Sequence, residues 1–109
     1  MPREKYETLT EPMFYTLLCL REDCCGADIM ARVSALTHDR VRIGPGTLYA
    51  LLDGFQKAGF IRLTRIAGRQ RWYRLTPAGQ AALEAEYARL RSLTADYEAV
   101  MHPAKEDAP

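Results

Sequence analysis

The sequence predicts a mainly α-helical fold with a small β-hairpin wing, in the order of a winged helix-turn-helix, followed by one long helix. Apolar residues recur at helical spacing in three segments before residue 59, and the pattern then changes to the two-residue period of strands over 60–75. A last helical pattern runs from 77 to 101. With 109 residues, the chain is long enough for one hydrophobic core and too short for two domains of ordinary size.

The first two helices are predicted from their ends and apolar positions. Thr10 offers an N-cap to a helix whose first turn holds Glu11 and Pro12, and polar residues at 21–23 end that helix. Gly26 interrupts the chain, and a second apolar stripe then runs to Thr37. Residues 1–10 are either a frayed arm or a packing segment, because they are polar apart from Tyr6 and Leu9.

The third helix is predicted to be the centre of the molecule. It follows the run Gly44-Pro45-Gly46, and its apolar residues fall at i, i+3, i+4 and i+7, so a single stripe faces the core. Its other face is small and polar, as expected where a helix approaches a ligand. Thr47 is an N-cap, a ligand contact or both, and Tyr49 is either a partly buried ring or a ligand contact. The stripe consists of Leu48, Leu51, Leu52 and Phe55.

Residues 60–75 are predicted to form a β-hairpin. Regular alternation would place Ile61, Leu63 and Arg65 on one face, and a turn around Gly68 would leave Arg69 at the tip. Thr76 and Pro77 then have the residue types preferred at the cap and first position of a helix.

Positive charge is concentrated in the middle of the chain. Residues 40–74 carry eight basic residues and one acidic residue, a balance of +7, whereas residues 1–39 and 75–109 each carry a balance of −3. Such segregation favours a polyphosphate partner, and double-stranded DNA fits the predicted fold. The open helix N-terminus and the hairpin would supply the contacts. The predicted DNA-binding residues are Arg42, Gly46, Thr47, Tyr49, Arg69 and Arg71.

The last helix is longer than a domain this small needs for its own core. Its apolar residues recur at alternating steps of four and three, close to a coiled-coil seam, and charged residues, Glu86 among them, are expected on its other faces. We therefore expect a winged helix-turn-helix DNA-binding domain at 1–76, a dimerisation helix at 77–101 and a disordered tail at 102–109. The predicted dimerisation residues are Leu83, Tyr87, Leu90, Leu93, Tyr97 and Val100.

Several classes of site and of protein are not expected. The three cysteines and two histidines have no metal-ligand spacing, so neither a metal nor a cofactor is predicted, and no catalytic constellation suggests an enzyme. The chain has no signal-peptide pattern and no apolar run long enough for a membrane span, so a soluble cytoplasmic protein is expected. Oxidant sensing by Cys24 and Cys25 stays open, although inert or merely exposed thiols fit the sequence better.

Three motifs resemble the PadR family of bacterial transcriptional regulators: the helix start at 46–52, the Gly59-Phe60-Ile61 step, and the run at 68–79 from the basic wing to Leu75-Thr76-Pro77-Ala78-Gly79. The similarity covers about residues 9–100 and suggests the subclass with a short C-terminal region. It implies a homodimer joined through the C-terminal helix, a palindromic operator and, usually, repression. It also implies a small hydrophobic or aromatic effector bound near the dimer interface.

One alternative keeps the fold and changes the function. A winged helix can serve as a protein-protein interaction module that does not bind DNA, because a fold alone does not fix function. The basic middle of the chain argues against this alternative. Salt distinguishes the two, since binding to duplex DNA weakens steeply as salt is added.

Overall fold

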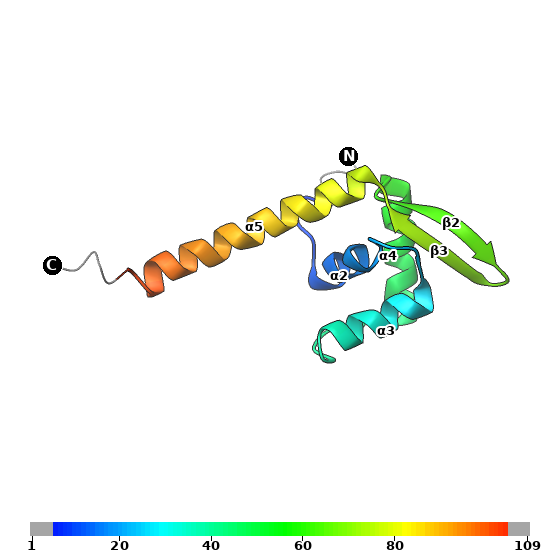
Figure 1. The fold of residues 1–109 in the computed structure, drawn as a ribbon, viewed down its shortest axis with the longest axis horizontal. Coiled ribbons are helices and arrows are strands. Elements are labelled where there is room, and N and C mark those ends of the chain that lie inside the picture. Colours follow the sequence, from blue (N-terminus) through cyan, green and yellow to red (C-terminus); the bar gives the residue numbers. More distant parts are fainter. Residues whose placement is uncertain (1–5, 105–109) are drawn as a thin grey trace.

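The computed structural model describes residues 6–104. The predicted helices and hairpin follow in the predicted order, and the mainly helical winged helix-turn-helix class is confirmed (Figure 1). The elements are α2 (Glu11–Cys19), β1 (Cys24–Cys25), α3 (Gly26–Leu36), α4 (Pro45–Ala58), β2 (Ile61–Ala67), β3 (Gln70–Leu75) and α5 (Pro77–Met101). Residues 105–109 of the expected tail lie outside the described part of the chain.

The core lies between the three short helices and one face of the sheet. Tyr6 and Leu9 are buried in it, so the part of the N-terminal segment that the structure describes is a packing segment. The rings of Phe55 and Phe60 each lie 5.3 Å from the Tyr6 ring, between centroids. The most deeply buried apolar side chains come from all three helices and include Leu17, Leu20, Ile29, Val33, Leu48, Leu52 and Phe55.

The sheet has a third strand that the sequence did not predict. β1 pairs antiparallel with β3, which makes the strand order β1-β3-β2. Its two residues, Cys24 and Cys25, are both buried, and Cys24 lies opposite Tyr73. The short strand fixes the base of the hairpin against the chain that leads into α3.

The hairpin contains a β-bulge, so the predicted regular alternation of β2 is wrong beyond Leu63. Leu63 lies opposite Tyr73 and Arg65 lies opposite Trp72, so Thr64 is an extra residue in β2. Arg65 consequently leaves the face of Ile61 and Leu63, where regular alternation would have placed it. Gly68 has φ of +61° in the two-residue turn, which fits a type II′ hairpin turn.

α5 begins with the predicted cap. The Thr76 hydroxyl accepts a hydrogen bond from the Gly79 amide at 3.1 Å and donates one to the Gly59 carbonyl at 2.6 Å. Gly79 is buried, and a Cβ there would overlap the carbonyl oxygen of Phe60. This position therefore needs glycine, because only the absence of a side chain lets the first turn of α5 lie against the end of α4.

The C-terminal half of α5 extends away from the body, on the side opposite the hairpin (Figure 1). The radius of gyration is 17.0 Å, whereas a compact domain of this length would have about 13 Å. Within the described part of the chain, no helix combines the length and the apolar character that a membrane span requires.

Glu86 does not lie on a solvated face of α5, as the charge pattern suggested. It is only 3% exposed, accepts a hydrogen bond from the Leu9 amide at 3.1 Å, and pairs with Arg89. The hydrogen bonds from Arg89 hold the pKa of the Glu86 carboxyl below its ordinary value. The buried carboxylate therefore attaches α5 to the segment before α2.

The thiols of Cys24 and Cys25 in β1 do not have the exposure expected of an oxidant sensor. Cys24 and Cys25 are buried, and burial raises the pKa of the Cys24 thiol to about 11. A thiol with a raised pKa is protonated at neutral pH and is a poor nucleophile. Residues 6–104 also contain no group of three or more potential metal ligands.

Candidate nucleic-acid interface

The N-terminus of α4 presents open backbone amides. Gly44 is the N-cap and makes no side-chain cap bond, so the alternative of Thr47 as N-cap is wrong. The first helical hydrogen bond runs from the Leu48 amide to the Gly44 carbonyl at 2.9 Å. The amides of Gly46 and Thr47 precede it and lack an intrahelical acceptor. They can therefore donate to a phosphate, and the helix dipole adds partial positive charge at the same place.

The exposed face of α4 has the character that the sequence predicted. Leu48, Leu52 and Phe55 are buried, whereas Gly46 and Thr47 are exposed. A Cβ at Gly46 would meet no atom within 4 Å, so this side of the first turn is open.

Tyr49 is partly packed against the protein and partly open to a ligand, so it has features of both predicted environments. Its side chain lies over Gly26 at the start of α3, where a Cβ would come within 2.9 Å of the Tyr49 hydroxyl. The residue is still 55% exposed. Contact with α3 restricts the ring while leaving surface for a partner.

The linker before α4 is held by Thr37. The Thr37 hydroxyl lies 2.8 Å from the Val33 carbonyl and accepts a hydrogen bond from the Val41 amide at 3.0 Å. These bonds fix the chain on both sides of His38 and Asp39, which have positive φ. Arg42 is exposed, and it forms an ion pair of 3.5 Å with Asp39.

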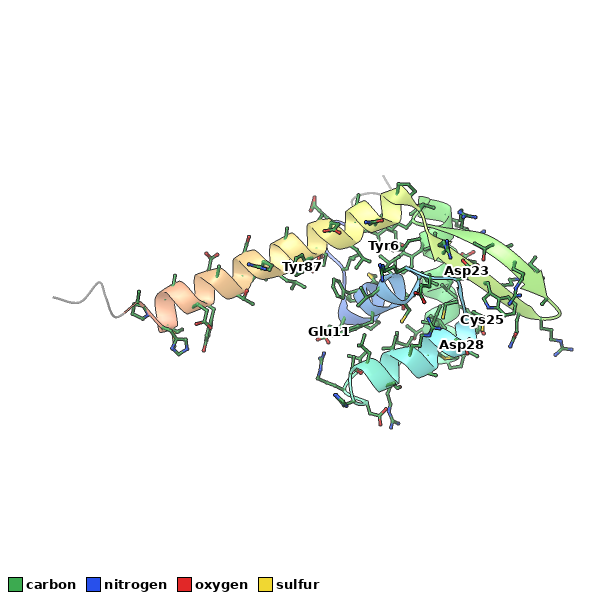
Figure 2. All side chains as sticks on the ribbon, viewed as in Figure 1. Tyr6, Glu11, Asp23, Cys25, Asp28 and Tyr87 are labelled. Carbon is green, nitrogen blue, oxygen red and sulfur yellow. The ribbon has the colours of Figure 1, made fainter. Side chains whose placement is uncertain are left out.

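Half of the basic residues in the middle of the chain have acidic partners. Arg40 pairs with Glu11 at 2.6 Å, and Figure 2 shows Glu11 at the start of α2, close to the loop that follows α3. Asp53 pairs with Lys57, and Asp23 pairs with Arg74. Together with Arg42, four of the eight bases are therefore partly neutralised.

The other four bases all lie on the hairpin. Among residues 6–104, none of them has an acidic side chain within ion-pair distance. Arg69 is exposed in the turn and Arg71 is exposed on β3. The remaining two are Arg62 and Arg65, so within residues 40–74 the bases without an acidic partner are all on the hairpin.

Arg65 belongs to this surface, although it is absent from the predicted set. Its guanidinium carbon lies 3.8 Å from the centroid of the Trp72 ring. Strict alternation put Arg65 on the inner face of the hairpin, so the sequence could not pair it with Trp72. Only the bulge at Thr64 brings the two together.

The structure thus contains an open helix N-terminus and an arginine-rich hairpin. A model of the PadR-like family of transcriptional regulators matches residues 16–85, from α2 into α5. The chain belongs to the PadR-like family. The resemblance stated from its motifs is therefore confirmed, and the protein is a DNA-binding transcriptional regulator of this family.

Solved structures of PadR-like and other regulators have the same fold. A PadR family transcriptional regulator from Eggerthella lenta aligns with a TM-score of 0.69 at 21% identity, over 91% of this chain and 83% of that one. A PadR-like transcription factor from Bacteroides fragilis aligns with a TM-score of 0.67 at 22% identity, over 94% and 95%. A transcriptional regulator from Clostridium thermocellum aligns with a TM-score of 0.64 at 22% identity, over 87% of each chain. No curated protein sequence matches the chain significantly.

Proposed function

We propose that this PadR-like regulator is a homodimeric repressor that binds a palindromic operator. In each protomer, the N-terminal half of α4 enters a major groove and the hairpin lies along the adjacent minor groove. The observation that carries the proposal is the presence of open amides at Gly46 and Thr47 together with a hairpin on which four of the five arginines have no acidic partner among residues 6–104. The chromosome is the partner, which makes the cytoplasm the expected location.

α5 supplies the surface that we propose for dimerisation. Gly79, Leu83 and Glu86 lie on its inner face and pack against the protomer's own body. The same heptad spacing continues at 90, 93, 97 and 100, but there the apolar side chains are exposed: Leu93 to 53%, Tyr97 to 55% and Val100 to 75%. A second copy of α5 would cover this row. Of the predicted residues, Leu83 packs on its own protomer, and Tyr87 and Leu90 lie where the helix leaves the body.

Dimerisation would match the spacing of two DNA half-sites. Two α4 helices held about one duplex turn (~34 Å) apart would meet successive major grooves on one side of the DNA. A two-fold protein requires a two-fold operator, so an inverted repeat is expected. We propose residues 1–76 as the DNA-binding unit and α5 as the dimerisation unit.

A groove beside α5 supports the proposal of an effector. It has a volume of about 410 Å³ and is lined by side chains of α2, the turn after α2, β3 and α5, with apolar Phe14, Leu83 and Tyr87 next to Arg21 and Arg74. This volume suits a small hydrophobic or aromatic molecule. A ligand here would touch both the body and α5, and it could release DNA by favouring a different separation of the two α4 helices.

Three single substitutions test the DNA interface. We expect Arg69→Ala to weaken binding to a duplex selected from a random pool and to a random-sequence duplex by the same factor, because it removes a backbone contact. Thr47→Ala and Tyr49→Phe should lower affinity mainly for the selected duplex, by about 5- to 100-fold if either hydroxyl contacts a base edge. Fluorescence anisotropy with labelled duplexes measures both affinities.

Lys57→Gln is the matched control for the loss of one charge. Lys57 lies in the last turn of α4 and is paired with Asp53 at 3.1 Å. Its replacement should change neither affinity appreciably. If Arg69→Ala, Thr47→Ala and Tyr49→Phe all bind as the wild type does, the proposed interface is wrong.

A further inference from the structure

The outer part of the hairpin extends beyond the third strand. β1 pairs with β3 only at Tyr73 and Trp72, so the segment from Arg65 to Arg71 forms a two-stranded ribbon. Figure 1 shows this ribbon projecting from the body. Residues 65–72 contain three arginines and no acidic residue. The ribbon is therefore a positively charged projection with one surface on each side.

The bulge at Thr64 distributes two of these arginines between the two surfaces. If the register set by Leu63 opposite Tyr73 continued without a bulge, Arg65 would lie directly opposite Arg71. Like charges directly opposite each other destabilise a strand pair. The extra residue instead places Arg65 opposite Trp72 and Ile66 opposite Arg71.

Directly opposite residues share a face, and neighbouring residues along a strand point to opposite faces. Arg71 therefore lies on the face that continues from the buried Tyr73, whereas Arg65 and Trp72 lie on the outer face. Arg69 is in the turn between the strands. The three arginines thus occupy one face, the tip and the other face of the same ribbon.

Arg65 is held in place by Trp72, and no acidic side chain of residues 6–104 lies within ion-pair distance of it. At 3.8 Å from the ring centroid, the guanidinium is within cation–π distance of the indole. Contact through the guanidinium face leaves N–H groups at its edge that can donate to an oxyanion. Because the side chain is already ordered, binding costs less conformational entropy than it would for a free arginine.

We propose that Arg65 is a further phosphate-binding residue of the hairpin and that Trp72 positions it. Arg65 and Arg71 then contact the two phosphate strands that border one minor groove, while Arg69 contacts the backbone from the tip of the ribbon. The minor groove is only about 6 Å wide, narrower than the ribbon with its side chains, so a ribbon that lies over the groove has a phosphate strand beside each face. This inference rests on the proposed binding of the hairpin to duplex DNA.

The test is the salt dependence of binding to a random-sequence duplex of about three helical turns (~30 base pairs). Arg65→Gln should reduce the slope of log K against log salt by about 1 per protomer and weaken binding about 5- to 10-fold per site at 0.1 M salt. Arg71→Gln should have a similar and additive effect. Trp72→Leu should weaken binding by part of the Arg65→Gln effect and add little to it in the double variant, whereas Trp72→Phe should restore most of the affinity.

Arg91→Gln is the control for loss of a stacked arginine. Arg91 lies 5.8 Å from the Tyr87 ring centroid and donates a hydrogen bond to the Tyr87 hydroxyl at 3.1 Å, but it is on α5, away from the hairpin. Its replacement should leave the salt slope unchanged. Circular dichroism and light scattering would establish that each variant keeps its fold and assembly state.

Trp72 also supplies a direct optical signal, because it is the one tryptophan in the sequence. A phosphate that binds Arg65 changes the environment of the indole, so its emission should change until the duplex saturates the protein. Arg65→Gln should remove most of that change, and Arg71→Gln should preserve it.

Two results separate this inference from the proposed function. If the wild type binds duplex DNA and Arg69→Ala weakens binding, but Arg65→Gln keeps the wild-type salt slope and emission change, the role of Arg65 is wrong and the DNA interface stands. If the wild type fails to bind any duplex at low salt, both the interface and the role of Arg65 are wrong.

Discussion

Tyr97→Glu is expected to separate the proposed dimer and to lower affinity for a two-site operator by about 100- to 10,000-fold, the range lost when two linked binding events become independent. Tyr97 is 55% exposed in the single protomer, so glutamate should leave the protomer fold intact. In a dimer, however, its charge would enter the row formed by Leu93 and Val100, close to the same charge from the second copy. Sedimentation velocity gives the assembly state, and anisotropy gives the affinity.

Ala95→Glu is the matched control. Ala95 is also exposed on α5, but the helical period places it almost opposite Tyr97. The same charge there should leave both the dimer and operator affinity unchanged. If Tyr97→Glu sediments as the wild type does, the row at 90–100 is not the dimer interface.

Gly79→Ala is expected to destabilise the fold by about 1–3 kcal/mol, the usual cost of forcing extra volume into a packed site. In an exposed helix the same change would stabilise by up to about 1 kcal/mol. The sign is reversed here because the new Cβ would overlap the Phe60 carbonyl oxygen and lie 2.9 Å from a Leu75 methyl carbon. Urea denaturation at one fixed protein concentration measures the difference in unfolding free energy.

Gly46→Ala provides the comparison within the same protein. Gly46 lies in the first turn of α4, as Gly79 does in α5, but no atom lies within 4 Å of its added Cβ. Its replacement should be neutral or stabilising. If Gly79→Ala were as stable as Gly46→Ala, the close packing of α5 on Phe60 would not be a requirement of the fold.

The elements with strong local signals could be predicted from the sequence. Thr10 and Thr76 have side chains suited to caps, Pro12 and Pro77 sit in first turns, and Gly59 ends α4 in the left-handed conformation. These signals act within a few residues of chain, so the order of helices and hairpin followed from them.

The features that depend on distant partners could not be predicted. β1 has two residues, too few to show a period, and it exists because β3 lies beside it. The bulge at Thr64 moves Arg65 to the other face of the hairpin, and the amino-acid composition of β2 does not indicate this shift. Glu86 resembles any exposed helix charge until the Leu9 amide approaches it from a segment 77 positions earlier.

The same distinction between local signals and distant partners applies to the candidate site. Arg69 and the open start of α4 followed from turn and helix-end chemistry. The ion pairs that neutralise Arg40 and Arg74 join separate elements, so the sequence showed a basic middle but not which part of it remains uncompensated.

The central claim is that α4 and the hairpin of a dimer bind the backbone of duplex DNA. The most direct measurement is the affinity of the full chain for a duplex over a series of salt concentrations. If Arg69 and Arg71 of two protomers each neutralise one phosphate, log K should fall linearly with log salt with a slope of about −4 or steeper. A protein that binds no duplex at low salt, or whose binding does not change with salt, would contradict the account.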